Sequence, residues 1–209
     1  MFRSAGTPPR VEAQCWSCGG LERHRFFALE AERFLATSAE GPSRVLHVAP
    51  EECLENIVLG AANHCVQIDL LRDDVDLNAD LTRLPFPNET FDAIICNHVL
   101  EHVANDKAAL KECKRVLKST GTAILSVPVK GELTFEDASI TSEEDRIHYF
   151  GQKDHVRQYG EDFGARLESL DFEVDKKTAD DAFTQSEVLR FGLGPGTGSY
   201  YLARKRLSA

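Results

Sequence analysis

Polar side chains end several apolar runs of this sequence, at positions where they could bind a ligand. Asp69 closes the run 65–69 and lies 22 residues after His47, which belongs to the earlier run 45–49. An acid at this distance, at the tip of a second parallel strand, is typical of side chains that accept hydrogen bonds from the ribose hydroxyls of a nucleotide. A helix-capping or solvated Asp is the alternative, and the spacing favours ligand binding.

Asn97 and His98 end a third apolar run that begins at Phe91. In open α/β sheets ligands bind outside the carboxyl ends of the strands, so we expect Asn97 to contact a ligand near the reacting group. His98 either acts on the substrate or packs. His98 and His102 are four residues apart, a spacing that can bind zinc on a helix, but without a third ligand the pattern favours packing for His102 and no metal.

A second group of reactive side chains lies near residue 155. His155, Arg157 and Tyr159 follow a long polar, acidic stretch, 131–154. Connections of this length inside a compact domain usually serve a function, for example as a lid or an acceptor loop. His155 titrates near neutral pH and is a candidate general base, with Arg157 and Tyr159 closing over the substrate. The alternative is that these residues form only the entry to a helix.

Cys15 and Cys18 have the spacing of half a zinc knuckle. A closed structural site needs four ligands, and His24 would supply only a third. The sequence therefore predicts no metal, and redox-sensitive or vestigial thiols in this stretch. The other cysteines are expected to be reduced core thiols.

The elements that position these residues alternate between strands and helices. Apolar runs at 45–49, 65–69, 91–97 and 123–127 predict buried strands, and Pro50 is suited to the first turn of a helix. Helices are expected at 21–36, at 106–117 with Asp106 as N-cap, and at 159–170. Two further strands are expected at 172–174 and 199–203. Such alternation predicts a mostly parallel sheet covered on both faces.

This order of segments closely resembles the class I S-adenosylmethionine (SAM) dependent methyltransferases. The phrase 150–160 and the pieces 15–26 resemble a bacterial branch of methyltransferase type 11-like proteins. The resemblance implies an α/β, Rossmann-like doubly wound fold, whose mostly parallel seven-stranded sheet has an antiparallel last strand. It also implies an N-terminal tail and covering helix with the CxxC pair at 1–43. A SAM-binding domain at 44–209 would carry an acceptor or lid insertion at about 129–158.

The implied cofactor is SAM. Asp69 would bind its ribose, and Asp80 lies where the family places an acid for the adenine amino group. The residues expected to bind the cofactor are His47, Ala49, Glu51, Asp69, Leu70, Asp80, Leu81 and Asn97. The first loop departs from the family pattern of an acid followed by alternating glycines, because it reads His-Val-Ala-Pro-Glu. This departure argues more strongly against a dinucleotide site than against a SAM site. The pyrophosphate of a dinucleotide needs the glycine loop, whereas Glu51 or His47 can hold the amino-acid end of SAM.

Charge and length limit the acceptor. The net charge is −10, which argues against a nucleic-acid partner, and no apolar run is long enough for a membrane span. The N-terminus lacks the apolar region of a signal peptide, so we expect a cytoplasmic protein that methylates a small molecule. A small thiol is favoured over a phenol or carboxylate, since a thiol needs only a mild base such as His155. A NAD-linked oxidoreductase and a catalytically silent binding protein remain as rivals, and the oligomeric state stays open.

Overall fold

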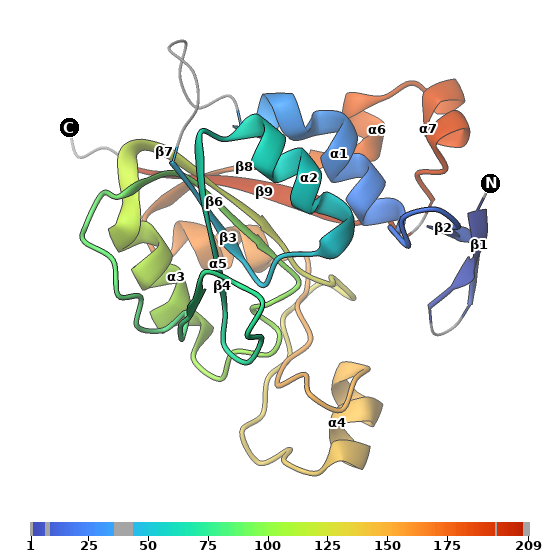
Figure 1. The fold of residues 1–209 in the computed structure, drawn as a ribbon. Coiled ribbons are helices and arrows are strands. Elements are labelled where there is room, and N and C mark those ends of the chain that lie inside the picture. Colours follow the sequence, from blue (N-terminus) through green and yellow to red (C-terminus); the bar gives the residue numbers. More distant parts are fainter. Residues whose placement is uncertain (1, 7–8, 36–43, 195, 207–209) are drawn as a thin grey trace.

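The computed structural model describes residues 2–6, 9–35, 44–194 and 196–206, which are arranged around one seven-stranded sheet (Figure 1). The strands are β3 Arg44–Val48, β4 His64–Asp69, β5 Leu77–Asn78, β6 Phe91–Asn97, β7 Leu117–Ser126, β8 Phe172–Thr178 and β9 Ser199–Lys205. Their order is β5-β4-β3-β6-β7-β9-β8. The first five in this order pair in parallel, and β9 lies antiparallel between β7 and β8. The predicted doubly wound sheet with an antiparallel last strand is confirmed.

Helices cover both faces of the sheet because successive strand residues point to opposite sides. On one face lie α1 Glu22–Leu35, α2 Glu52–Ala61, α6 Ala179–Ala182 and α7 Gln185–Phe191. On the other lie α3 Asp106–Val116 and α5 Phe163–Glu168. Val45 and Leu46 are neighbours in β3, yet Val45 packs under α1 and α2 whereas Leu46 belongs to the core under α3. The sheet therefore has two separate hydrophobic cores.

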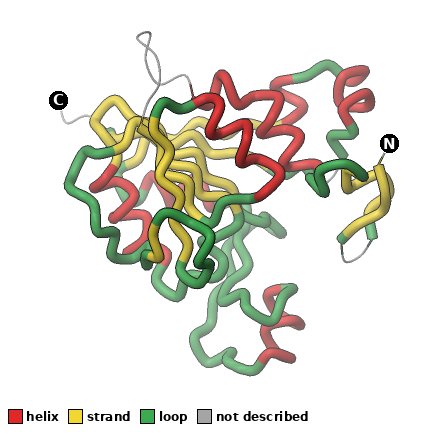
Figure 2. The backbone as a smooth tube through the Cα atoms, viewed as in Figure 1, coloured by secondary structure: helices red, strands yellow, loops and turns green. Residues whose placement is uncertain are grey.

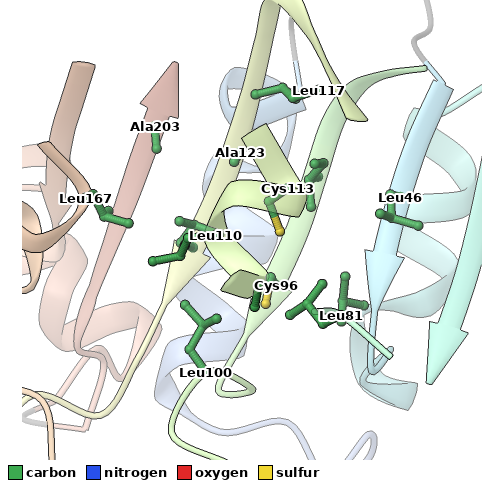
Figure 3. Close-up of a cluster of buried hydrophobic side chains, with 14 of the residues drawn as sticks. Leu46, Leu81, Cys96, Leu100, Leu110, Cys113, Leu117, Ala123, Leu167 and Ala203 are labelled. Atoms are coloured by element: carbon green, nitrogen blue, oxygen red, sulfur yellow. The ribbon is translucent and has the colours of Figure 1, made fainter. Parts of the chain in front are cut away.

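The core under α3 and α5 is built of buried aliphatic and aromatic side chains, and Figure 3 shows part of it. Leu110 and Cys113 of α3 and Leu167 of α5 lie over the small side chains of Ala123 and Ala203 in the sheet. Burying one leucine side chain contributes about 1.5–3 kcal/mol, so this layer holds the strand ends in register.

An aromatic cluster joins the first helix to the last strand. The ring of Tyr200 in β9 lies 5.5 Å from that of Phe26, 5.6 Å from Phe27 and 5.4 Å from Phe34, centre to centre. Its hydroxyl donates to the carbonyl of Arg23 at 3.1 Å. The helix expected at 21–36 is α1, and its last expected residue lies outside the described part of the chain.

The segment after β7 leaves the layered part of the molecule. Figure 2 shows it as a loop that carries only α4, Glu143–Phe150, below the carboxyl ends of the parallel strands. Backbone hydrogen bonds close its neck: the amide of Lys130 donates to Tyr159, and Phe135 and Gln158 pair in both directions. Gly160 sits in this neck, where a Cβ atom would come within 2.4 Å of the Leu133 backbone. Only glycine therefore fits there without a backbone shift.

Two local expectations were wrong. The N-terminal stretch forms a hairpin, β1 Phe2–Ala5 and β2 Arg10–Cys15, instead of a tail. Long-range contacts explain this, because Arg25 of α1 donates to the carbonyl groups of Ala13 and Phe191, and Arg10 pairs with Glu22 at 2.9 Å. The N-cap of α3 is Asn105, whose side chain accepts from the amide of Ala108, and not Asp106.

Among the helices of the described residues, none combines the length and the apolar character that a membrane crossing requires.

Candidate functional site

Strand register places the expected ligand-binding residues side by side at one edge of the sheet. Val48 pairs with Ile68 on one side and with Cys96 on the other, and Asn97 pairs with Ser126. Asp69, Ala49, Asn97 and Ser126 therefore follow one another across neighbouring strands, about 4.8 Å apart per strand. The switch point of the sheet lies between β3 and β6, where ligands of open α/β sheets bind.

The first loop has the backbone of a glycine loop without the glycines. Ala49 directly follows β3 with φ +47°, in the left-handed region, and its amide donates to Ile68 at 2.7 Å. Glu51 then takes the N-cap position of α2. An alanine in this conformation is strained by roughly 1–2 kcal/mol, and strain of this kind persists where the surrounding structure fixes the backbone.

Glu51 is the centre of a buried polar group above the first loop. One of its carboxylate oxygens lies 3.4 Å from the side-chain nitrogen of Asn97 and 3.7 Å from Nε2 of His47. The other lies 3.5 Å from Nε2 of His24, which reaches over from α1. Burial alone would raise the pKa of Glu51, but His24 and His47 lower it to about 2. Glu51 is therefore a carboxylate at neutral pH.

Several polar atoms in this group have no hydrogen-bond partner among the described residues, although His24 and His47 each lie at ion-pair distance from Glu51. They are both ring nitrogens of His47, Nε2 of His24, Oε1 of Glu51, Oδ1 of Asn97 and Oγ of Ser126. Buried polar atoms without partners are rare in folded proteins, and a cluster of them indicates a polar ligand. Carboxylate and amide oxygens would accept from an ammonium group, whereas imidazole and hydroxyl groups can donate to a carboxylate. The set therefore fits the amino-acid end of SAM.

The two acids expected to bind nucleoside groups keep one oxygen available. Oδ1 of Asp69 accepts from the amides of Leu71 and Arg72, at 2.8 and 3.0 Å, and Oδ1 of Asp80 accepts from Thr82. Within the part of the chain that the structure describes, no hydrogen bond involves the Oδ2 atom of either acid. The hydrogen bonds from Thr82 lower the pKa of Asp80.

The apolar neighbours of these acids differ in exposure. Leu70 is 63% exposed, so it is open to contact with a ligand, whereas Leu81 is 5% exposed and belongs to the core. A contact between Leu81 and an adenine ring would therefore involve a side chain that is fixed by the packing of the core.

His98 lies on the acceptor side of the edge. It follows Asn97 with φ +52°, and its amide donates to the carbonyl of Ser126 at 2.9 Å. Its Nδ1 lies 3.3 Å from Glu101, and the side chain is 26% exposed. The expected helix directly after β6 does not form, because residues 98–105 make turns before α3 begins. His98 and His102 therefore do not share a helix face.

Arg157 and Tyr159 are engaged in contacts within the protein, whereas we expected from the sequence that they close over the substrate. The guanidinium of Arg157 donates to the carbonyl groups of Leu100, Val103 and Ala104 and to Glu136, and its residue is 3% exposed. Tyr159 is fully buried and donates to Asp106 at 2.7 Å. Both side chains fasten the insertion to the turn before α3, so they position the loop.

His155 is buried on the inner side of the insertion. Its Nδ1 lies 3.2 Å from the carbonyl of Phe150, and its Nε2 has no partner among the described residues. Burial lowers the pKa of His155, against the effect of Glu101. The ring is therefore neutral at pH 7, as a base requires, but it is only 4% exposed.

A cavity of about 410 Å³ lies between the insertion and the start of α3. Its walls are charged and include Asp106, Glu136, Arg146 and Arg166. None of the residues expected to bind the cofactor lines it. Its charged groups pair with one another, for example Arg166 with Asp106 at 2.7 Å, so they have few free partners for a ligand.

Cys15 ends β2 and Cys18 lies in the turn after it, and all six cysteines are free thiols. Backbone amides of Cys18 and Ser17 lower the pKa of Cys15. His24, the expected third ligand, is directed elsewhere, since its Nδ1 lies 3.0 Å from the sulfur of Cys53. Burial raises the pKa of Cys53 to about 11.

Sequence reasoning missed three members of this region: His24, Glu101 and Ser126. Ser126 ends β7, one residue before the end of the predicted strand 123–127, and could have been found by the same rule as Asn97. His24 and Glu101 carry no local signal, because contacts between distant segments bring each of them into place.

Comparison with known proteins agrees with this geometry. Residues 47–125 match a family described as "Methyltransferase domain". Over 59 residues the chain is 44% identical to an uncharacterized protein of Methanocaldococcus jannaschii, a match that covers 28% of this chain and 26% of that protein. The chain thus spans only about a quarter of the length of this curated relative.

Solved structures show the same fold at low identity. A SAM-dependent methyltransferase from Archaeoglobus fulgidus superposes with a TM-score of 0.57 at 14% identity, over 87% of this chain and 94% of the other. The 1,6-didemethyltoxoflavin-N1-methyltransferase of Burkholderia thailandensis, with bound 1,6-didemethyltoxoflavin and S-adenosylhomocysteine, gives 0.57 at 14% identity, over 88% and 79%. At such identity the likeness concerns the fold.

Proposed function

We propose that this chain, whose residues 47–125 match a methyltransferase domain, is a class I SAM-dependent enzyme that transfers the methyl group of SAM to a small-molecule nucleophile. The observation that carries this proposal is the set of buried, unpartnered polar atoms around Glu51 at the switch point of the sheet. This set offers a carboxylate for an ammonium group and imidazole and hydroxyl groups for a carboxylate. Such pairing matches the amino-acid end of SAM.

In this proposal different side chains bind the amino-acid end, the ribose and the adenine of the cofactor. Glu51, His24 and His47 hold the amino-acid end, Asp69 accepts from the ribose hydroxyls, and Asp80 accepts from the adenine amino group. When bound, SAM supplies an electrophilic methyl group on a sulfonium. Asn97 and His98 then lie next to the acceptor, because they end the strand beside the first loop. Much of the rate comes from alignment in a water-poor site, where positioning contributes about 7–11 kcal/mol.

For the acceptor we propose a small thiol, with a phenol or carboxylate as the alternative. The net charge of −10 disfavours a nucleic-acid substrate. The acceptor side holds imidazole groups, of which His98 is partly exposed and His102 is exposed. A thiol with a pKa of about 8.5 is partly ionised at neutral pH, so a nearby imidazole suffices to take its proton. The toxoflavin enzyme, whose structure holds a small molecule beside S-adenosylhomocysteine, supports an acceptor of that size.

Calorimetric titration with S-adenosylhomocysteine tests the cofactor assignment. Asp69→Ala and Glu51→Gln should each weaken binding at least about 10-fold, because a hydrogen bond to a charged group contributes about 1.5–3 kcal/mol. Asp73→Ala removes an exposed carboxylate nearby and serves as the matched control. If the folded wild type binds no S-adenosylhomocysteine, the proposal fails and a silent binding protein takes its place. Binding of NAD in the same experiment would favour the oxidoreductase.

A panel of small thiols, phenols and carboxylic acids, with labelled SAM as donor, then tests the acceptor class. Methylation of phenols or acids without any thiol product would contradict the thiol proposal while leaving the cofactor assignment intact.

A further inference from the structure

A cluster of three possible metal ligands lies beside the cofactor edge, on the acceptor side. Ligand atoms of Glu101, His102 and His155 all lie within 4.8 Å of one another. The two imidazole rings are 4.7 Å apart, centre to centre, and nearly perpendicular. Ligands of a tetrahedral ion with bonds of about 2.0–2.2 Å are roughly 3.4 Å apart, so small rotations of the side chains would close the site. From this cluster we infer a binding site for a divalent first-row transition metal ion.

The ring nitrogens of both histidines are arranged as in metal sites. A metal-binding histidine usually donates its other N–H to a carboxylate or a backbone carbonyl, which fixes the tautomer and turns a lone pair toward the ion. Nδ1 of His102 lies 3.2 Å from the carboxylate of Asp154, and Nδ1 of His155 lies 3.2 Å from the carbonyl of Phe150. Nε2 of each ring is left for the ion, and Nε2 of His155 is buried without a partner among the described residues.

Glu101 supplies the charge. It is 1% exposed, and its Oε1 lies 3.3 Å from Nδ1 of His98. Its Oε2 is buried and has no partner in the part of the chain that is described. A buried carboxylate is stable when it is paired or coordinates a metal. An ion held by Glu101 and two neutral imidazoles would provide a partner for both Oε2 of Glu101 and Nε2 of His155.

The insertion completes the site. His155 comes from a segment more than fifty residues after Glu101 and His102, and the amide of Val156 donates to the carbonyl of Glu101 at 2.9 Å. Four hydrogen bonds of Arg157 hold the same segment against the turn 100–104 and against Glu136. Two ligands therefore come from a turn and one from a fastened loop, so the site exists only when the insertion is docked.

Two imidazoles and one carboxylate select the kind of ion. Imidazole suits zinc, iron and cobalt, whereas magnesium and calcium prefer oxygen ligands. Three protein ligands also leave a coordination position open, as in catalytic rather than structural zinc sites. A thiol bound there would lose its proton to the solvent and remain as thiolate on the ion. This use of the site rests on the proposed function, whereas metal binding itself does not.

Metal titration of the full chain tests the inference. Protein dialysed against a chelator is titrated with Co²⁺ and followed by its visible absorption, and bound Zn²⁺ is counted after equilibrium dialysis. We expect one ion per chain, a four- or five-coordinate Co²⁺ spectrum without thiolate charge-transfer bands, and no displacement by excess Mg²⁺. Glu101→Gln and His102→Ala should weaken binding at least about 10-fold, and Asp154→Asn about 10–100-fold as an outer partner.

Controls separate this site from the thiols and from misfolding. His148→Ala removes an exposed histidine of the same insertion and should leave binding unchanged. Cys15→Ser with Cys18→Ser should also leave one ion bound. Circular dichroism and S-adenosylhomocysteine binding show whether each variant is folded. The inference is overturned if wild type binds no Co²⁺ or Zn²⁺, if the ion is lost with the cysteines, or if folded Glu101→Gln and His102→Ala bind as wild type does.

Discussion

Asp106 holds the insertion to the sheet domain, and its removal should be among the most damaging changes of one side chain. It is 2% exposed at the start of α3. Its carboxylate accepts two hydrogen bonds from Arg166 of α5 and one from Tyr159, all at 2.7 Å. Asp106→Asn keeps the shape but removes the charge and puts a donor opposite Arg166. Breaking one partner of a buried ion pair costs about 3–5 kcal/mol.

We expect a loss near the lower end of this range, because the Arg166 side chain is 14% exposed and water can reach it. The assay is urea denaturation, with Asp180→Asn, an exposed carboxylate of α6, as the matched control. A loss below about 1 kcal/mol, equal to that of the control, would refute the reasoning that this pair is effectively buried.

The pH dependence gives a second readout. Burial raises the pKa of Asp106, but the hydrogen bonds from Arg166 and Tyr159 outweigh it and hold the pKa below its ordinary value. A carboxylate with a lowered pKa stabilises the fold above its unfolded pKa of about 3.9, and this stability is lost as the pH falls through the folded pKa. The gap between wild type and Asp106→Asn should therefore narrow below about pH 4. A gap independent of pH would point to altered packing instead of charge.

Two further substitutions test the strained loop and the neck of the insertion. Ala49→Gly should leave the free energy of unfolding unchanged or raise it by up to about 1 kcal/mol, since glycine adopts the left-handed conformation without strain. The same exchange at Ala108 in α3 should lower the free energy of unfolding by about 1 kcal/mol. Equal losses at both alanines in urea denaturation would contradict the strain. Gly160→Ala places a Cβ against the Leu133 backbone and should cost about 1–3 kcal/mol and weaken the metal affinity. Gly60→Ala in α2, with open space around its Cβ and a helical backbone, should spare both stability and the metal site. Unchanged stability and metal binding in Gly160→Ala would show that the neck is not closely packed.

The sequence predicted the parts of the fold that depend on short-range patterns. Apolar runs located β3, β4, β6 and β7, and the polarity of the strand ends located Asp69 and Asn97, because a buried parallel strand is almost continuously apolar until it meets the ligand edge. The N-terminal hairpin was not predicted, because Arg25 connects it to α7, which is far away in the chain.

The sequence predicted which strand ends lie side by side at the edge of the sheet, but it predicted much less about the contacts of the insertion. Strand spacing alone pointed to Asp69, whose binding to a ribose stays a prediction. The roles of Arg157 and Tyr159 depend on which buried groups lie opposite them, and no pattern in one sequence shows that Asp106 and three carbonyl groups do so. For the same reason His102 was judged to lack a third ligand, although Glu101 is adjacent and His155 lies close in space.

The aromatic cluster around Tyr200 has a consequence for how the protein is made. Because β9 follows α1 by most of the sheet domain, the surface on which Phe26, Phe27 and Phe34 dock is complete only after β9 has left the ribosome. Helix α1 is synthesised first but cannot dock until this surface has formed. His24 lies on α1 and reaches Glu51 only once α1 has docked, and within the Glu51 group described above it alone comes from the N-terminal region. A nascent or truncated chain that lacks β9 would therefore lack the docking surface that places His24 beside Glu51.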